Sequence, residues 1–151
     1  MTCRLLVVAF LGTLSVCHAG GRVKDAKDKF AELEGSWTIV KMEIDGRSLL
    51  EKDEKWKLII KNGKLSSDAR KARKDSVDLS KILDPAKKPK TVTAAYEGAI
   101  TFVGIYEVKG DELRVCGDAV DTATETTPEA RRPKKFDSKE GLLLVFKREK
   151  K

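Results

Sequence analysis

Short runs in which apolar and polar residues alternate constrain this chain more than any other feature. The alternating apolar positions are Val40, Met42 and Ile44 in one run and Trp56, Leu58 and Ile60 in the next. A period of two is typical of strands that bury one face. Asp45-Gly46 follows the first run and Asn62-Gly63 follows the second, and both pairs favour tight hairpin turns. The sequence therefore predicts antiparallel strands.

The same pattern continues along the rest of the chain. Further strands are expected near residues 77–79, 92–96, 100–108, 113–115 and 142–148, whereas the Thr-rich segment 117–135 has no periodicity and predicts a loop. Short strands spaced by roughly ten residues are typical of a sandwich or an up-and-down barrel. Closure into a barrel removes exposed sheet edges. We therefore predict an all-β fold, an up-and-down antiparallel β-barrel of about eight strands.

Residues 1–19 have the organisation of a cleaved signal peptide. Arg4 precedes an apolar stretch over residues 5–16, and Cys17 and Ala19 supply the small residues that signal peptidase requires. About a dozen apolar residues are too few to span a bilayer, so no transmembrane segment is expected. We predict cleavage before Gly20 and a secreted or periplasmic protein, with a lipoprotein anchored through Cys17 as the alternative. A polar lead-in over residues 20–32 and a barrel domain over 33–151 would follow.

Removal of that segment leaves few chemically reactive side chains. His18 is the single histidine, and Cys3 and Cys17 are two of the three cysteines. Without imidazole and with one remaining thiol, Cys116, the mature chain has no set of residues for a zinc site. Cys116 follows Val115 in an expected strand, where a cysteine is more often a small buried apolar residue than a nucleophile. We therefore expect a protein that is not an enzyme and has no metal or cofactor.

Two basic clusters, at residues 70–74 and 131–135, lie in expected loops of a chain with a net charge of +7. Such runs are usually solvated, but they also favour anionic partners. Neither cluster contains an aromatic residue on which a base could stack, so nucleic acid is not an expected partner. These clusters define one functional hypothesis, a cell-envelope interaction module that binds a protein or an anionic polymer.

The other hypothesis is a small hydrophobic ligand bound inside the barrel, and it is the one that we favour. Eight-stranded barrels leave room for side chains or one small ligand. Small residues cluster between 94 and 104, where they would leave space inside. The candidate ligand-binding residues on the predicted inner face are Met42, Leu58, Ile60, Tyr96, Phe102 and Tyr106.

Four separated motifs make the chain resemble a family of exported domains of unknown function that is expanded in planctomycete bacteria. The motifs are LEGSW at 33–37, LDPAKKPKTV at 83–92, GIYEVKGDELRVC at 104–116, and RRPKKFDS followed by LLLVFKRE within 131–149. The family looks like a lipocalin-type barrel, and Gly35-Ser36-Trp37 is similar to the G-x-W that opens the first lipocalin strand. The resemblance implies a fold but no activity or ligand.

One end of the barrel is predicted from the first and last strands. Trp37 begins the first strand, and Arg148 shares a face with Leu142, Leu144 and Phe146 in the last. If that face points inward, Arg148 stacks on the Trp37 ring, as a late arginine does in lipocalins. We therefore assign Gly35, Trp37 and Arg148 structural roles at this end. Trp37 is out of phase with the apolar positions 40, 42 and 44 unless a β-bulge intervenes.

Overall fold

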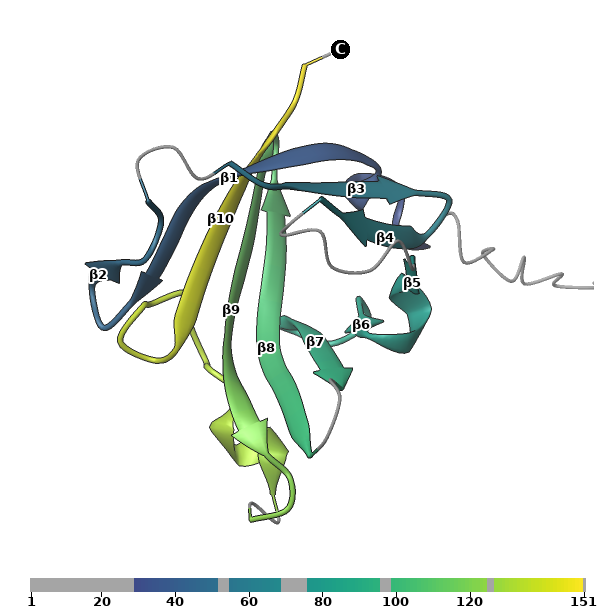
Figure 1. The fold of residues 1–151 in the computed structure, drawn as a ribbon. Helices are drawn as coiled ribbons and strands as arrows, with labels where there is room; N and C mark the ends of the chain where they lie inside the picture. Colours follow the sequence, from purple (N-terminus) through teal and green to yellow (C-terminus); the bar gives the residue numbers. More distant parts are fainter. Residues whose placement is uncertain (1–28, 52–54, 69–75, 96–98, 125–126, 151) are drawn as a thin grey trace, which may run out of the picture.

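A computed structural model describes residues 29–51, 55–68, 76–95, 99–124 and 127–150 of the chain. These residues form one ten-stranded sheet whose paired strands are antiparallel (Figure 1). The strands are β1 (Gly35–Ile44), β2 (Arg47–Ser48), β3 (Lys57–Lys61), β4 (Lys64–Ser67), β5 (Val77–Asp78), β6 (Leu83–Asp84), β7 (Lys90–Ala95), β8 (Ile100–Lys109), β9 (Glu112–Asp121) and β10 (Leu142–Arg148). The described ranges also contain the short 3-10 helices η1 (Ala31–Leu33), η3 (Leu79–Lys81) and η4 (Pro128–Arg131). The all-β prediction is confirmed.

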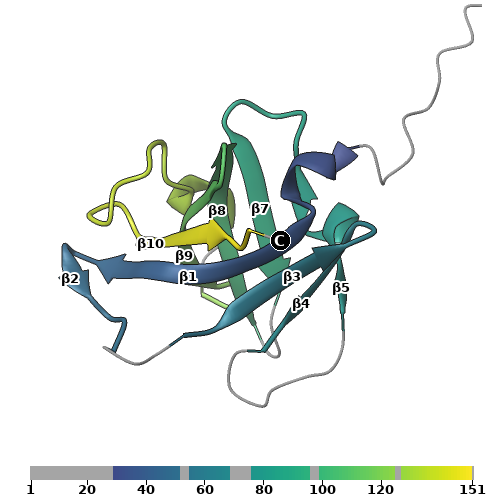
Figure 2. The same ribbon diagram turned by 90° about the horizontal axis from the view of Figure 1, so that it is seen from above.

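The sheet is a curled half-barrel in which most strands lie beside their neighbours in sequence. The strand order is β5-β4-β3-β1-β10-β9-β8-β7-β6, and β2 pairs with β1. Figure 2 shows the sheet curling so that β3 and β4 lie across an interior from β7 and β8. β5 and β6 form the two edges, and η3 joins them. The expected number of about eight strands was too low. β2 and β6 have two residues each, too few to show a period, and β4 lies in a segment where no strand was expected.

A β-bulge in β1 resolves the phase of its side chains. The pairing of β1 with β10 shifts register just after Ile39, so Val40 is the extra residue. Trp37 and Ile39 are 0% and 3% exposed, whereas Val40 and Ile44 are 48% and 40% exposed. The predicted buried face of this strand is therefore wrong at Val40 and Ile44. The bulge brings Trp37, Ile39 and Met42 onto the inner face together.

The main hydrophobic core fills the end of the curled sheet beside η1. Its buried members are Phe30, Leu33, Trp37, Ile39, Ile60, Leu79, Val92, Tyr106, Leu113 and Phe146. Phe30 is 2% exposed although the sequence placed it in the polar lead-in. The packed domain therefore begins before residue 33 and includes Phe30.

A second, smaller core lies on the outer face of β8, β9 and β10. Ile105, Cys116, Leu143 and Val145 are buried there, and Phe136 packs against them. Phe136 belongs to the segment that connects β9 to β10 and covers this face. The prediction of a loop over residues 117–135 is wrong at 117–121, where β9 continues to Asp121, and at Pro128–Arg131, where η4 forms.

Candidate functional site

The inner face of the sheet surrounds an apolar cavity of about 270 Å³. Its walls come from both halves of the curled sheet and from the segments beside η1, η3 and β6. The lining residues are Leu33, Trp56, Leu58, Ile60, Leu65, Leu79, Ile82, Leu83, Val92, Ala94, Phe102, Tyr106, Leu113, Val115, Leu142, Leu144 and Phe146. Trp56 and Tyr106 are the members of this set whose side chains carry a polar atom. The arrangement suits an apolar molecule with few polar groups.

The cavity has a deep end and an open end. At the deep end the lining side chains are buried, among them Tyr106 and Leu113. Ala94 lies near the end of β7 and Phe102 near the start of β8, and the two residues are paired in the strand register. Both are only half-buried. The side chains nearest solvent in this part of the wall are therefore at Ala94 and Phe102, and the buried ones are at Tyr106 and Leu113.

Arg148 and Trp37 close the end of the sheet beside η1. The Arg148 guanidinium carbon lies 4.1 Å from the centroid of the Trp37 ring. Arg148 also donates hydrogen bonds to the carbonyls of Glu34 and Glu32, the latter at 2.7 Å. The Trp37 indole N–H donates to the carbonyl of Leu33 at 2.8 Å. The predicted stacking of Arg148 on Trp37 is present, and these bonds tie η1 across the end of the sheet.

Gly35 is required at this end for two reasons. Its φ of +131° is a conformation that side chains disfavour, and a Cβ would lie 3.2 Å from Arg148 Nη1. The three residues that the sequence assigned to the barrel end, Gly35, Trp37 and Arg148, are thus in mutual proximity. None of them lines the cavity.

Four of the six candidate ligand-binding residues line the cavity, namely Leu58, Ile60, Phe102 and Tyr106. Met42 was misplaced: it packs against the main core but is not part of the cavity wall. Tyr96 lies outside the described residues. Sequence reasoning did not include Leu113 and Val115 among the candidates, although both lie in an expected strand. It also missed Leu33, Leu79 and Ile82, which lie in or beside 3-10 helices where no period marks an inward position.

Tyr106 is the polar feature of the deep end. It is 2% exposed, and its buried hydroxyl has no hydrogen-bond partner within the described part of the chain. Burial raises the pKa of this hydroxyl far above its usual range, and the carboxylates of Glu32 and Asp84 raise it further. Lys90, which is ion-paired with Glu32, lies with its Nζ 5.9 Å from the centroid of the Tyr106 ring. The hydroxyl is therefore neutral and available as a donor.

We expect Tyr106→Phe to raise the free energy of unfolding by about 1 kcal/mol. A buried polar group without a partner costs about 1–3 kcal/mol, and the substitution removes it while keeping the ring. Equilibrium denaturation in urea measures the difference. A Tyr106→Phe protein that is less stable than the parent by a similar amount would mean that the hydroxyl has a stabilising partner.

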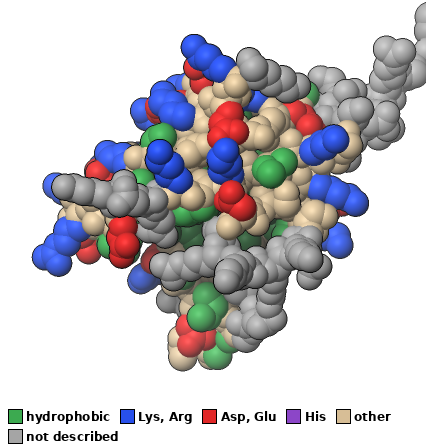
Figure 3. Space-filling view, turned by 45° about the horizontal axis from the view of Figure 1, so that its top comes forward, with side chains coloured by type: hydrophobic (Ala, Val, Ile, Leu, Met, Phe, Trp, Pro, Cys, Tyr) green, Lys and Arg blue, Asp and Glu red, His purple; other side chains and the backbone are tan. Residues whose placement is uncertain are grey.

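The basic cluster at 131–135 is largely neutralised within its own fold. Arg131 pairs with Asp118 at 2.8 Å, and Lys135 lies 3.4 Å from Glu140 and 3.8 Å from Asp137. Figure 3 shows positive and negative side chains interspersed over one face of the molecule. The cluster at 70–74 lies outside the described residues. The described cations thus give little support to a single-sign patch for an anionic polymer.

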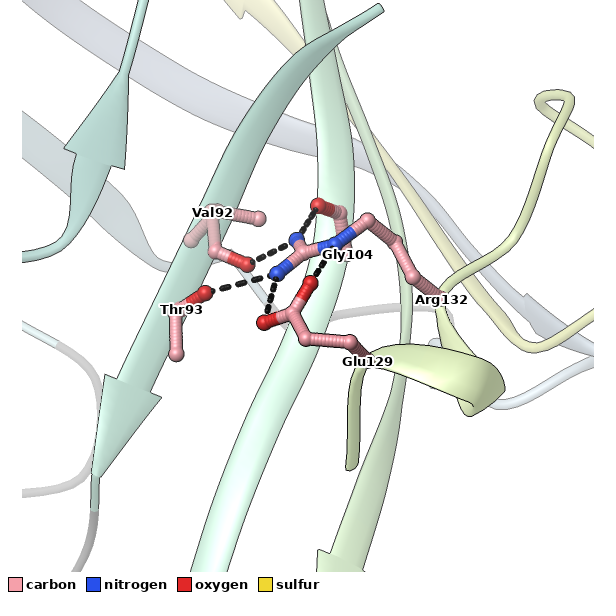
Figure 4. Close-up of polar contacts among 5 residues, drawn as sticks. All are labelled: Val92, Thr93, Gly104, Glu129 and Arg132. Carbon is pink, nitrogen blue, oxygen red and sulfur yellow. Dashed lines mark hydrogen bonds and ion pairs between the residues drawn. The ribbon is translucent and has the colours of Figure 1, made fainter. Parts of the chain in front are cut away.

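Arg132 is an internal clamp. Its guanidinium donates hydrogen bonds to the carbonyls of Val92 and Gly104 and to Thr93 Oγ1, the last at 2.8 Å (Figure 4). Two further bonds, at 2.8 and 2.7 Å, go to the carboxylate of Glu129. The Arg132 side chain is 11% exposed. Arg132 therefore fastens η4 to β7 and β8 and is not free for a partner.

Cys116 has the surroundings of a structural residue. It is 0% exposed in the outer core, and its Sγ lies 3.5 Å from the carbonyl of Asp137. Burial raises the pKa of the thiol, which disfavours the nucleophilic thiolate.

In the described ranges, no group of three His, Cys, Asp or Glu side chains is placed to hold a metal ion, and no helix is long and apolar enough to cross a membrane. The predicted signal peptide at 1–19 lies outside the described residues. Comparison with protein-family models, curated proteins and solved structures finds no match to this chain. The resemblance to the exported domain family therefore stays a prediction.

Proposed function

We propose that this protein is an exported, non-enzymatic binding protein that holds a small hydrophobic molecule inside a lipocalin-like β-barrel. The observation that carries the proposal is the apolar cavity of about 270 Å³ between the two halves of the sheet. Apolar cavities of roughly 150 Å³ can already bind benzene. The strand order, in which β10 returns to pair with β1, supports the lipocalin-like interpretation.

The apolar interior is favoured over a basic docking surface because most cations of the basic loop already have carboxylate partners. Arg131, Arg132 and Lys135 of the basic loop already have carboxylate partners, whereas the cavity walls carry two polar side-chain atoms in total. Exchanging an internal ion pair for one with a polymer gains little at an exposed site. Transfer of apolar ligand surface from water into the cavity is favourable at about 25 cal/mol per Å².

A matched pair of substitutions in β7 tests the proposal. Ala94 lines the open end of the cavity, and Ala95, the next residue, is exposed on the other side of the strand. We expect the parent to bind the neutral fluorescent probe N-phenyl-1-naphthylamine saturably. Ala94→Phe fills part of the opening, and we expect it to weaken binding by about tenfold or more, equivalent to about 1.4 kcal/mol.

Ala95→Phe is the control, because it adds the same ring outside the cavity. We expect its probe affinity to stay within about twofold of the parent, a difference of less than 0.5 kcal/mol at roughly 1.4 kcal/mol per tenfold. Fluorescence titration of the three proteins at equal concentration gives the result. Unsaturable probe binding in the parent, or equal losses in both variants, would contradict binding inside the cavity.

A further inference from the structure

The buried hydroxyl of Tyr106 specifies what kind of molecule the cavity takes. Resting on the proposed function, we infer that the ligand is a neutral amphiphile: an apolar body with one uncharged hydrogen-bond acceptor that accepts from the Tyr106 hydroxyl at the deep end. Within the described residues, the Tyr106 hydroxyl is the buried side-chain oxygen that has no hydrogen-bond partner. Tyr106 also forms part of the cavity wall.

The strand register fixes the direction in which such a ligand lies. Tyr106 is opposite Lys90 at the deep end, and Phe102 is opposite Ala94 at the open end. Four residues of a strand span about 13 Å. A ligand that reaches Tyr106 therefore passes its apolar body along Phe102 and leaves that body near the opening, with its polar group innermost.

The ligand, rather than water, is the partner that suits the hydroxyl. A buried water molecule needs two to four polar partners to be held. The residues around the cavity offer Tyr106 itself and the Trp56 indole N–H, and the other lining side chains are hydrocarbon. A carbonyl or ether oxygen on an apolar molecule needs one donor, which Tyr106 provides, and its remaining surface fits the apolar wall.

The charges around the deep end select against an anionic head group. The ammonium of Lys90 is ion-paired with Glu32. Asp84 accepts a hydrogen bond from the backbone N–H of Ala86 at 3.1 Å. Glu32 and Asp84 also favour the protonated form of Tyr106, in line with a negative field at the hydroxyl. A carboxylate placed there would meet repulsion and lose its hydration.

Three competitors of similar size, each a phenyl ring with a five-carbon chain, test the inference by displacing the fluorescent probe. Valerophenone and pentylbenzene differ by one carbonyl oxygen, and 5-phenylpentanoate, called phenylpentanoate below, carries a carboxylate at the end of its chain. We expect the ratio of valerophenone to pentylbenzene affinity to fall about fivefold to tenfold in Tyr106→Phe, the value of one hydrogen bond. In the parent we expect phenylpentanoate to bind at least about tenfold more weakly than valerophenone. Using the ratio within each protein cancels changes in probe affinity and in folded fraction.

The outcomes separate this inference from the proposed function. If the probe binds the parent but the affinity ratio is unchanged in Tyr106→Phe, the assigned anchor is wrong and the apolar binding site stands. If phenylpentanoate binds as tightly as valerophenone, the selection for a neutral group is wrong. If neither the probe nor any competitor binds the parent, the proposed function fails and the inference fails with it. Urea denaturation verifies that Tyr106→Phe is folded, as its expected gain in stability requires.

Discussion

Trp37→Ala should lower the free energy of unfolding by about 3–5 kcal/mol, the range for removing a large buried aromatic side chain. Trp37 is 0% exposed and donates a hydrogen bond to the carbonyl of Leu33. Its loss also removes the ring on which Arg148 lies. Chemical denaturation followed by far-ultraviolet circular dichroism measures the change.

Trp56→Ala is the matched control, since it makes the same substitution at the wall of the open cavity. Trp56 is half-buried, and its main described ring contact is an edge-on one with Phe146 at 5.5 Å. Because solvent already reaches Trp56, we expect a smaller loss, about 1–2 kcal/mol. Equal losses for the two variants would contradict the assignment of Trp37 to the closed end.

Arg132→Ala should lower the free energy of unfolding by about 2–3 kcal/mol, because hydrogen bonds to a charged group are worth about 1.5–3 kcal/mol. The substitution leaves the carbonyls of Val92 and Gly104 without the donor that satisfies them and releases Glu129. Arg132→Lys should rescue little, because an ammonium cannot reach this set with the planar fork of a guanidinium.

Arg131→Ala is the neighbouring control. Arg131 is paired with Asp118, and its side chain is 56% exposed. Exposed ion pairs contribute about 0–1 kcal/mol, so we expect little change in the unfolding midpoint. Should Arg131→Ala prove as destabilising as Arg132→Ala, the clamp assigned to Arg132 would be wrong.

Much of the sheet could be predicted from the sequence because period-two alternation is a local property. The last strand was expected at 142–148, which is where β10 lies, and the expected tight turns have positive φ at Asp45, Gly46, Asn62 and Gly63. The stacking of Arg148 on Trp37 followed from the face that Arg148 shares with Phe146. Where one face of a regular strand is buried, the alternation of apolar and polar residues shows which side chains point inward.

The remaining features depend on contacts between distant segments. The phase difference between Trp37 and positions 40, 42 and 44 indicated that β1 could contain a bulge, but the extra residue, Val40, is set by the pairing of β1 with β10. The segment that carries Phe136 covers the outer face of the sheet and buries Ile105 of β8 and Cys116 of β9. That segment is irregular, so no periodicity in its own sequence indicated that it packs there. The partner of Arg131 is thirteen residues away in sequence, and a charge run does not reveal such a pair.

The site was predictable to a similar extent. Leu58, Ile60, Phe102 and Tyr106 were found because they lie at alternating positions of regular strands. Leu33 and Leu79 were not, because they come from 3-10 helices. The sequence did not indicate that the Tyr106 hydroxyl lacks a hydrogen-bond partner, since this depends on whether any neighbouring segment places a polar group beside it.

The central claim, an apolar cavity open to small molecules, can be tested through the protein's own two tryptophans. Trp56 lines the cavity and Trp37 does not. Bromobenzene is small and apolar, and its heavy atom quenches indole fluorescence on contact. We expect saturable quenching in the parent and no saturable quenching in Trp56→Phe. Quenching that rises linearly without saturation in the parent, or that saturates equally in Trp56→Phe, would contradict the claim.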